Sequence, residues 1–390
     1  MYSHVKIVYA IIWVLNIVVM LYSGVKMSKT KTDKAYWNCA LPAIIMYMVF
    51  MGLRFGRLID YNLYANTYAK IGLDFASDDH ELLFKIICYA MNMVGLPYQA
   101  FILFCSFMII FTALYFLKEY RPAMPYMLLA FLLEASMVEN FVRWYLAVSF
   151  LLMYLYYLRR GKKVCFIFAV AAVMVHVGML FLVFAFFFIN KVKIVPFPPI
   201  VWQGLLIASE FFGSRMIFAF LAPYVGLLGI DERSAGYADQ FVDIINGDFG
   251  GMGVISRRSI FTSIRITLGY SFPIYMISYL VKEKIIRPID ANSYLIGIVL
   301  SPICDQVEIL GRFSGVFTLF ATIVSGSAFY YYFKRRRLFK SFYFPFAVLS
   351  LFSFVWPLIS GVTYRDDWWQ MLFIWDAHGR DYLPVDYFKK

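Results

Sequence analysis

Residues 52–64 read GLRFGRLIDYNLY, a short polar stretch at the end of an apolar run. A helix continuing through it would place its arginines and tyrosines on one face, at spacings of three and four residues. These residues are Arg54, Arg57, Tyr61, Tyr64 and Tyr68, with Asp60 beside them. The common form of such a stretch is an Arg–Asp pair with aromatic anchors at the bilayer surface. The functional alternative is a cationic, aromatic-lined site for an anionic, sugar-bearing substrate.

The composition defines the class of protein. Hydrophobic residues make up 62% of the 390 positions, aromatic residues 20% and charged residues only 15%. Ordinary soluble domains are about 45–50% apolar, so a soluble enzyme is excluded. Apolar runs of about 15–25 residues recur along the chain, each long enough or nearly so to cross a bilayer. We predict an all-α, polytopic integral membrane protein with about 11–12 transmembrane helices, forming a single membrane domain over residues 1–390.

The net charge is +12, and the basic residues that produce it are clustered along the chain. Half of the 36 Lys and Arg residues fall in five short loops, at 26–34, 118–121, 159–163, 282–287 and 334–340. Basic clusters next to membrane helices mark the cytoplasmic side, so the charge reports topology and does not indicate nucleic-acid binding. The five cysteines are scattered without CxxC spacing, which indicates neither a disulfide framework nor a zinc site.

With the basic loops placed inside, the parity of crossings predicts the spanning segments. They are 5–22, 38–53, 98–117, 123–138, 141–158, 164–189, 260–281, 291–310, 314–333 and 341–361, with a hairpin of two short helices in 200–230. Segment 81–95 carries Lys85 and would break the parity, so we predict a re-entrant or interfacial helix there. The loop 231–258 is then the main external loop, and tryptophans seat the external tail 362–390 at the membrane interface.

The same parity places several charged or polar residues on the external side, near helix ends. They are Arg54, Arg57, Asp60, Glu139, Asn140, Arg143, Glu308 and Arg312. External arginines gain nothing from the positive-inside rule, but several arginines together suit a diphosphate, because guanidinium groups match phosphate oxygens in bidentate geometry. The alternative is a set of structural ion pairs, Arg143 with Glu139 and Arg312 with Glu308, each at i,i+4.

Two further features are candidates of lower specificity. His176 lies near the middle of segment 164–189, where an ionisable group is either functional or hydrogen-bonded to a neighbouring helix. Asp78, Asp79 and Glu81 form an acidic run that has the ligand type for a divalent cation, although such loop carboxylates are usually solvated. We expect no metal and no cofactor.

Four pieces of the sequence carry a resemblance. They are GLRFGRLIDYNLY followed by Glu81, NFVRWYLAVSFLLMYLYYLRRGKK from Asn140, AAVMVHVGML around His176, and LGRFSG around Arg312. In this order they resemble the EpsG family of Wzy-like polysaccharide polymerases. Trp144 stands where a Gln normally follows the family's Arg, so the hydrogen-bonding role of that Gln cannot be carried over. Leu58 and Ile59 stand where the family usually has a Gly shortly before the DY pair.

The resemblance implies a GT-C-like membrane glycosyltransferase. Its reaction is the polymerisation of undecaprenyl-diphosphate-linked oligosaccharide repeat units at the outer face of the bacterial cytoplasmic membrane, for an O-antigen, a capsule or an exopolysaccharide. A polyprenyl diphosphate leaves as a stable anion, so the enzyme needs positive charge at the diphosphate and a base for the acceptor hydroxyl.

We assign these roles to the external residues. Arg54, Arg57, Arg143 and Arg312 are the charge stabilisers, and Asp60 and His176 compete for the role of base. Tyr61, Tyr64, Glu81, Asn140 and Glu308 complete the expected substrate site. The expected partners are the lipid-linked oligosaccharide, membrane lipids, and a chain-length regulator and flippase of the same pathway.

Three other functions share part of this pattern. A flippase for the same lipid would need cationic groups accessible from both sides, whereas the candidates outside the basic loops cluster externally. A ligase that transfers the glycan to another acceptor would use nearly the same site. A structural subunit of an export complex would not need the arginines.

Overall fold

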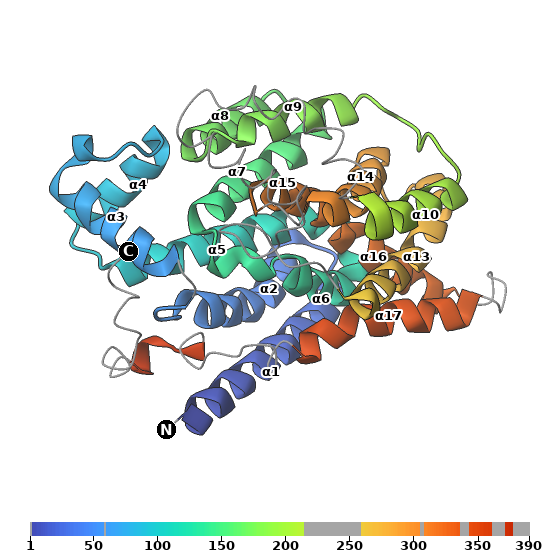
Figure 1. Cartoon of the computed structure of the whole chain (residues 1–390), viewed down its shortest axis with the longest axis horizontal. Coiled ribbons are helices and arrows are strands. Elements are labelled where there is room, and N and C mark those ends of the chain that lie inside the picture. Colours follow the sequence, from blue (N-terminus) through green and yellow to red (C-terminus); the bar gives the residue numbers. More distant parts are fainter. Residues whose placement is uncertain are drawn as a thin grey trace. The chain divides into compact units, whose positions relative to one another are not determined.

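The computed structural model describes residues 2–57, 60–213, 259–304, 308–335, 343–360 and 371–376. Over these ranges the chain is helical apart from loops and one isolated β-bridge (Figure 1). In the same part of the chain, five helices are long and apolar enough to cross a membrane, and shorter apolar helices of 10–17 residues accompany them. The predicted all-α, multi-spanning membrane protein is thereby confirmed. The predicted loop 231–258 and most of the predicted tail 362–390 lie outside the described residues.

The contacts divide the chain into two compact units. The first is Met1–Lys191 with Trp356–Lys390, and the second is Val192–Val355. The helices of the first unit are α1 (Tyr2–Met27), α2 (Asp33–Tyr47), α3 (Asp60–Leu73), α4 (Leu82–Met93), α5 (Tyr98–Leu117), α6 (Met124–Glu134), α7 (Val142–Leu158), α8 (Cys165–Val175) and α9 (Met179–Ile189). In this unit α1 packs on α2 and α6, and α7 packs on α5 and α8. Gly24 permits the close contact of α1 with α6, because a Cβ there would lie 2.7 Å from the Pro125 Cα.

The opening stretch does not continue as one helix. Helix α2 begins with Thr32 as N-cap, whose side chain accepts a hydrogen bond from the Ala35 N–H, and it ends in a π-helical turn at Met48–Gly52. Gly56 then adopts φ 59°, a left-handed conformation suited to glycine, before α3 begins at Asp60. The continuous helical face is therefore wrong: the arginines lie in an irregular segment, and the tyrosines lie on α3.

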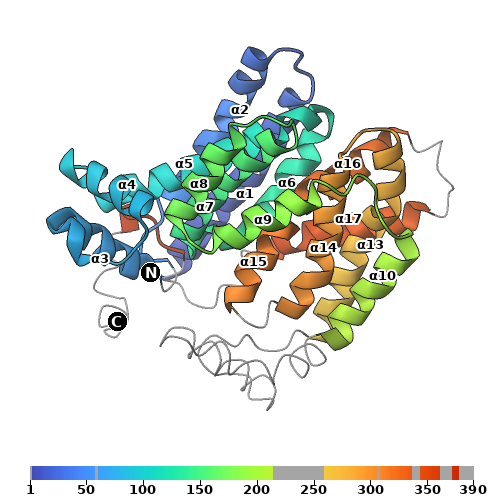
Figure 2. The ribbon, with the colours of Figure 1, turned by 90° about the horizontal axis from the view of Figure 1, so that it is seen from above.

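One more predicted crossing is interrupted, and segment 81–95, which was predicted not to cross, forms a short helix. Segment 164–189 is not one helix, because His176 has extended backbone angles (φ −155°, ψ 114°) and separates α8 from α9. Segment 81–95 forms α4, whose 12 residues span about 18 Å at 1.5 Å per residue, too short to cross a bilayer. Helix α4 packs against α3, and Figures 1 and 2 show the two helices together.

Helix α5 links two polar regions of the first unit. At its start, the Gln99 amide donates to the Gly52 carbonyl oxygen at the end of the π-helical turn. Near its other end, the Tyr36 hydroxyl donates to the Leu114 carbonyl oxygen over 2.8 Å, close to the beginning of α2. The 20 residues of α5 span about 30 Å, the thickness of the hydrocarbon core. The two ends of α5 therefore suit opposite faces of the membrane.

The second unit contains α10 (Pro199–Ala208), α13 (Ile260–Lys282), α14 (Pro288–Cys304), α15 (Glu308–Thr318), α16 (Ala321–Lys334) and most of α17 (Tyr343–Ser360). Within this unit α14 packs on α15, and α13 packs on α10 and α16. The turn predicted around Glu308 and Arg312 is wrong, because both residues lie in α15. The spanning segment begins earlier than predicted, since residues from Leu310 to Lys334 form one apolar helical stretch.

The arrangement around α7 predicts the sidedness of two exposed residues. Asp79 lies two residues before Glu81, which contacts the start of α7, and Lys162 follows the end of the same helix. In a cysteine-free background, we expect Asp79→Cys to react with a membrane-impermeant maleimide in intact spheroplasts. We expect Lys162→Cys to react only after permeabilisation. Equal labelling of both positions from outside would contradict a membrane-spanning α7.

Candidate functional site

An ion pair at the start of α7 brings three distant segments together. The Arg143 Nη1 donates to the Glu81 Oε2 over 2.6 Å, and the backbone N–H of Val177 donates to the other oxygen, Oε1, over 2.9 Å. The side chains of Arg143 and Glu81 are about one-fifth exposed, at 20% and 21%. The expected pairing of Arg143 with Glu139 is wrong, because Glu81 takes that place. The structure thus joins Glu81, Arg143 and the chain next to His176.

The helix ends at this cluster favour negative charge. Glu81 is the N-cap of α4, Arg143 lies in the first turn of α7, and Val177 directly precedes the N-cap residue of α9. The amino ends of three helices therefore meet at one carboxylate. Each N-terminus carries partial positive charge and backbone N–H groups without intrahelical acceptors, so such ends attract anions. The Glu81 carboxylate occupies the position of an anion in this structure.

His176 is held by backbone and aromatic contacts. Its Nδ1 accepts a hydrogen bond from the Gly178 N–H over 3.1 Å, so a neutral imidazole here carries its proton on Nε2. The Trp144 ring meets the imidazole edge to face, with the ring centroids 4.9 Å apart at 89°. Trp144, the residue that departs from the family pattern, thus orients the histidine by packing.

The acidic run before α4 holds its own loop in place. The Asp78 side chain accepts from the His80 backbone N–H over 2.9 Å and contacts the His80 ring, while the Lys85 Nζ donates to the Asp78 carbonyl oxygen over 2.8 Å. Burial raises the pKa of Asp78, but the hydrogen bonds from His80 outweigh it and the pKa lies below its ordinary value. Among the described residues no cluster of three or more potential metal ligands forms. The acidic run therefore holds in place the loop that leads to Glu81.

Arg57 is fully buried in a cage of carbonyl, carboxylate and aromatic groups. Its Nη1 pairs with the Glu139 Oε1 over 2.9 Å, with both side chains 0% exposed. Its Nε donates to the Leu372 carbonyl oxygen over 2.8 Å, and the guanidinium lies 4.1 Å from the Phe373 ring centroid. Backbone hydrogen bonds between residues 53–55 and 372–374 extend this contact. Arg57 has no exposed surface to offer a substrate in this arrangement.

Arg54 is also buried, at 1% exposure, and its Nη1 donates to the Met51 carbonyl oxygen. Within the described part of the chain its Nε has no hydrogen-bond partner. Asn140 lies half-buried just before α7, and its Oδ1 likewise has no partner among the residues described. Each residue therefore has a buried polar atom without a hydrogen-bond partner in the described part of the chain, next to the segments that carry the Arg57–Glu139 pair.

The tyrosines of α3 face the protein. Tyr61 is 7% exposed and donates from its hydroxyl to the Gln99 Oε1 over 3.1 Å, while Tyr64 is 9% exposed and packs on the Phe84 ring. These contacts fix α3 against α4 and α5. Asp60 opens α3 and is half-buried, at the end where a helix favours a carboxylate.

The remaining candidates belong to the second unit. Glu308 is the first residue of α15, and Arg312 lies half-buried on the same helix.

Several residues of the first-unit site have weak sequence signals. Gln99, Phe373 and Leu372 contact the arginine segment from positions far along the chain, and no local spacing predicts such contacts. Trp144 had a signal, since it follows Arg143 and departs from the family pattern.

One of three comparisons with known proteins identifies a family. The profile described as the EpsG family matches residues 36–368, most of the chain. No curated protein and no solved structure matches significantly.

The caged pair predicts a large, specific effect on stability. We expect Arg57→Ala to destabilise the protein by about 3–5 kcal/mol, because it leaves the Glu139 charge buried without its partner. The double variant Arg57→Met/Glu139→Leu should recover most of that loss, since it removes both charges. Thermal unfolding of the purified protein in detergent measures both. Lys70→Ala, which removes an exposed cation on α3, is the control and should change stability by less than about 0.5 kcal/mol. A double variant as unstable as Arg57→Ala would contradict this account.

Proposed function

The chain belongs to the EpsG family, and from that premise we propose that it polymerises lipid-linked oligosaccharide repeat units into a surface polysaccharide. The donor is an undecaprenyl-diphosphate-linked glycan at the outer face of the bacterial cytoplasmic membrane. The proposal rests on one observation: the amino ends of α4, α7 and α9 meet at Arg143, where a carboxylate already occupies an anion site.

A diphosphate suits this site better than a neutral sugar does. The Arg143 side chain is 20% exposed, and its buried Nε has no hydrogen-bond partner among the described residues, so the guanidinium keeps unused donor capacity for a phosphate oxygen that replaces Glu81. Three helix ends add partial positive charge that needs no rearrangement when the leaving group develops its own charge. Glu81 would give up its position to the diphosphate and release Arg143 and the Val177 N–H.

The transfer step needs one proton acceptor and one donor. The acceptor hydroxyl oxygen forms a bond to the anomeric carbon of the donor sugar, while the bond from that carbon to the diphosphate oxygen breaks. The hydroxyl proton passes to Asp60, which is half-buried at the start of α3. His176 has its Nδ1 occupied by the Gly178 N–H, which favours Nε2 as a hydrogen-bond donor to the departing diphosphate. This geometry favours Asp60 over His176 as the base.

The other predicted residues have supporting roles in this proposal. The buried Arg57 holds Glu139 and thereby the approach to α7, and Tyr61 and Tyr64 hold α3 so that Asp60 keeps its place. Arg54 and Asn140 stay predicted substrate-binding residues, although their unpaired polar atoms are buried in this arrangement. Glu308 and Arg312 stay predicted substrate-binding residues of the second unit.

A reconstituted polymerisation assay tests the function. Purified protein in proteoliposomes receives undecaprenyl-diphosphate-linked repeat units, and the products are separated by size. We expect a ladder of elongated lipid-linked glycans from the wild type. Arg143→Ala should lower its rate by about 10²–10³-fold, the usual loss when a charge-stabilising donor is removed. Arg143→Lys should recover only part of it, because an ammonium group cannot form the bidentate contact.

Two further variants sharpen the result. Glu81→Gln removes the competing negative charge, so KM for the lipid donor should fall. Lys70→Ala removes an exposed cation from α3 in the same unit and should leave the ladder of products unchanged. Movement of the lipid across the vesicle without any ladder would identify a flippase, and transfer of the glycan to a different acceptor would identify a ligase.

A further inference from the structure

Three loops of the first unit meet around a polar cavity far from the proposed active site. The cavity has a volume of about 580 Å³ and is lined from the α1–α2 loop, the turn after α5 and the end of α7. These are three of the five basic loops predicted to be cytoplasmic. Helices α5 and α7 both begin near the proposed active site and end at this cavity. The two sites thus lie at opposite ends of the same helices.

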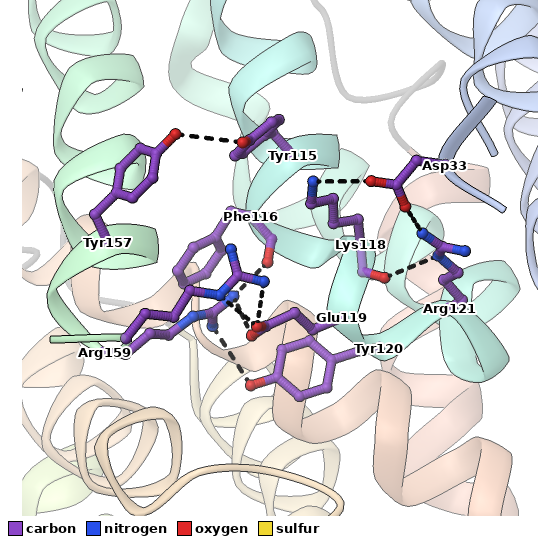
Figure 3. A network of polar contacts seen from close by, with 10 residues as sticks. Asp33, Tyr115, Phe116, Lys118, Glu119, Tyr120, Arg121, Tyr157 and Arg159 are labelled. Carbon is purple, nitrogen blue, oxygen red and sulfur yellow. Dashed lines mark hydrogen bonds and ion pairs between the residues drawn. The ribbon is translucent and has the colours of Figure 1, made fainter. Parts of the chain in front are cut away.

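The charges around the cavity do not balance (Figure 3). Asp33 is shared by Lys118, whose Nζ lies 3.4 Å from its carboxylate, and by Arg121. Glu119 is shared by two arginines, with the Arg159 Nη2 at 3.0 Å and the Arg160 Nη2 at 2.6 Å. Among the described residues, three cationic side chains (Lys118, Arg121 and Arg160) line the cavity with the two carboxylates, which leaves the lining with a net positive charge. Arg159 adds its charge from a buried position, since its side chain is only 1% exposed.

The cationic groups are held in place by aromatic rings. The Lys118 Nζ lies 4.1 Å from the Tyr115 ring centroid, and the Arg160 guanidinium lies 3.6 Å from that of Tyr156. Cation–π contacts of this kind limit the motion of long basic side chains without neutralising them. An incoming anion therefore meets donors that are already ordered.

Asp33 marks the position that an outside anion would take. Its side chain is 60% exposed and lies in the first turn of α2, so it can rotate into solvent without losing burial. Lys118 and Arg121 would then face the cavity with both charges available. The hydroxyl groups of Ser28 and Thr30 line the same cavity and offer further polar contacts.

We propose that this cavity binds a phosphate group at the membrane surface opposite the active site. The net positive charge of the lining, supported by the buried Arg159 next to it, suits the negative charge of a phosphate group. Basic pockets at the cytoplasmic ends of membrane helices are suited to the phosphates of anionic lipids, and a soluble phosphorylated molecule presents the same oxygens. The site is independent of the polymerase reaction, since none of its residues belongs to the Arg143 cluster.

Binding to defined probes tests the proposal. The full-length protein is placed in nanodiscs of phosphatidylcholine alone or with phosphatidylglycerol, and in detergent with inorganic phosphate. Retained lipid is measured by native mass spectrometry, and phosphate binding by the shift of the melting temperature. We expect phosphatidylglycerol to be retained by the wild type and to bind about tenfold more weakly to Lys118→Gln/Arg121→Gln.

A matched control separates the cavity from general surface charge. Lys162→Gln/Lys163→Gln removes the same charge from exposed positions of the loop after α7 that do not line the cavity, and it should retain the lipid as the wild type does. Equal weakening of both double variants, or no binding of either probe to the wild type, would overturn the proposal. A stabilising shift with inorganic phosphate alone, lost in the Lys118/Arg121 variant, would support the site and identify a soluble ligand as its source.

Asp33→Asn provides a second measurement that does not remove the cations. If Asp33 competes with the ligand, the variant should bind its phosphate probe about threefold more tightly, in keeping with the strength of an exposed ion pair. If the cluster only ties the loops together, Asp33→Asn will lower the melting temperature without tighter binding. That second result would overturn the proposal even if the Lys118/Arg121 variant failed to fold.

Discussion

The buried pair of Arg57 and Glu139 is the constraint on which the first unit depends. A guanidinium and a carboxylate with no exposed surface are tolerable only while each satisfies the other, since either charge alone would remain desolvated. Their partners come from three distant parts of the chain, because the Leu372 carbonyl and the Phe373 ring complete the cage. One electrostatic requirement therefore fixes the segment after α2, the turn before α7 and a short piece near the C-terminus.

This anchoring has a consequence for Arg143. The turn that contains Glu139 leads directly into α7, so the cage determines where the first turn of α7 lies. Because Arg57 takes Glu139, Arg143 pairs with Glu81 and stays partly exposed. The buried Arg57 thus stabilises the fold, and the partly exposed Arg143 retains the capacity to bind a ligand. A second charged cluster lies at the C-terminal ends of α5 and α7, opposite the end of α7 that carries Arg143.

The sequence predicted the class of fold because hydropathy follows directly from composition and run length. Counting crossings placed Arg57, Glu81 and Arg143 on one side, and Glu81 and Arg143 pair next to the backbone N–H of Val177, which follows His176. The count could not predict that the histidine would break its helix. Residues 164–189 are apolar throughout, and apolarity alone does not distinguish a continuous helix from two helices joined at His176.

The sequence by itself therefore determined that the protein is a helical, multi-spanning membrane protein with its basic loops predicted on one side of the membrane. It also determined membership of the EpsG family. These properties are local or additive along the chain. The tertiary structure alone decided which arginine is caged and which is exposed. It also decided that three helix ends meet at the Arg143–Glu81 pair and that three basic loops meet around the cavity next to Asp33. Such outcomes depend on contacts between residues far apart in the chain, and no spacing or composition within one segment encodes them.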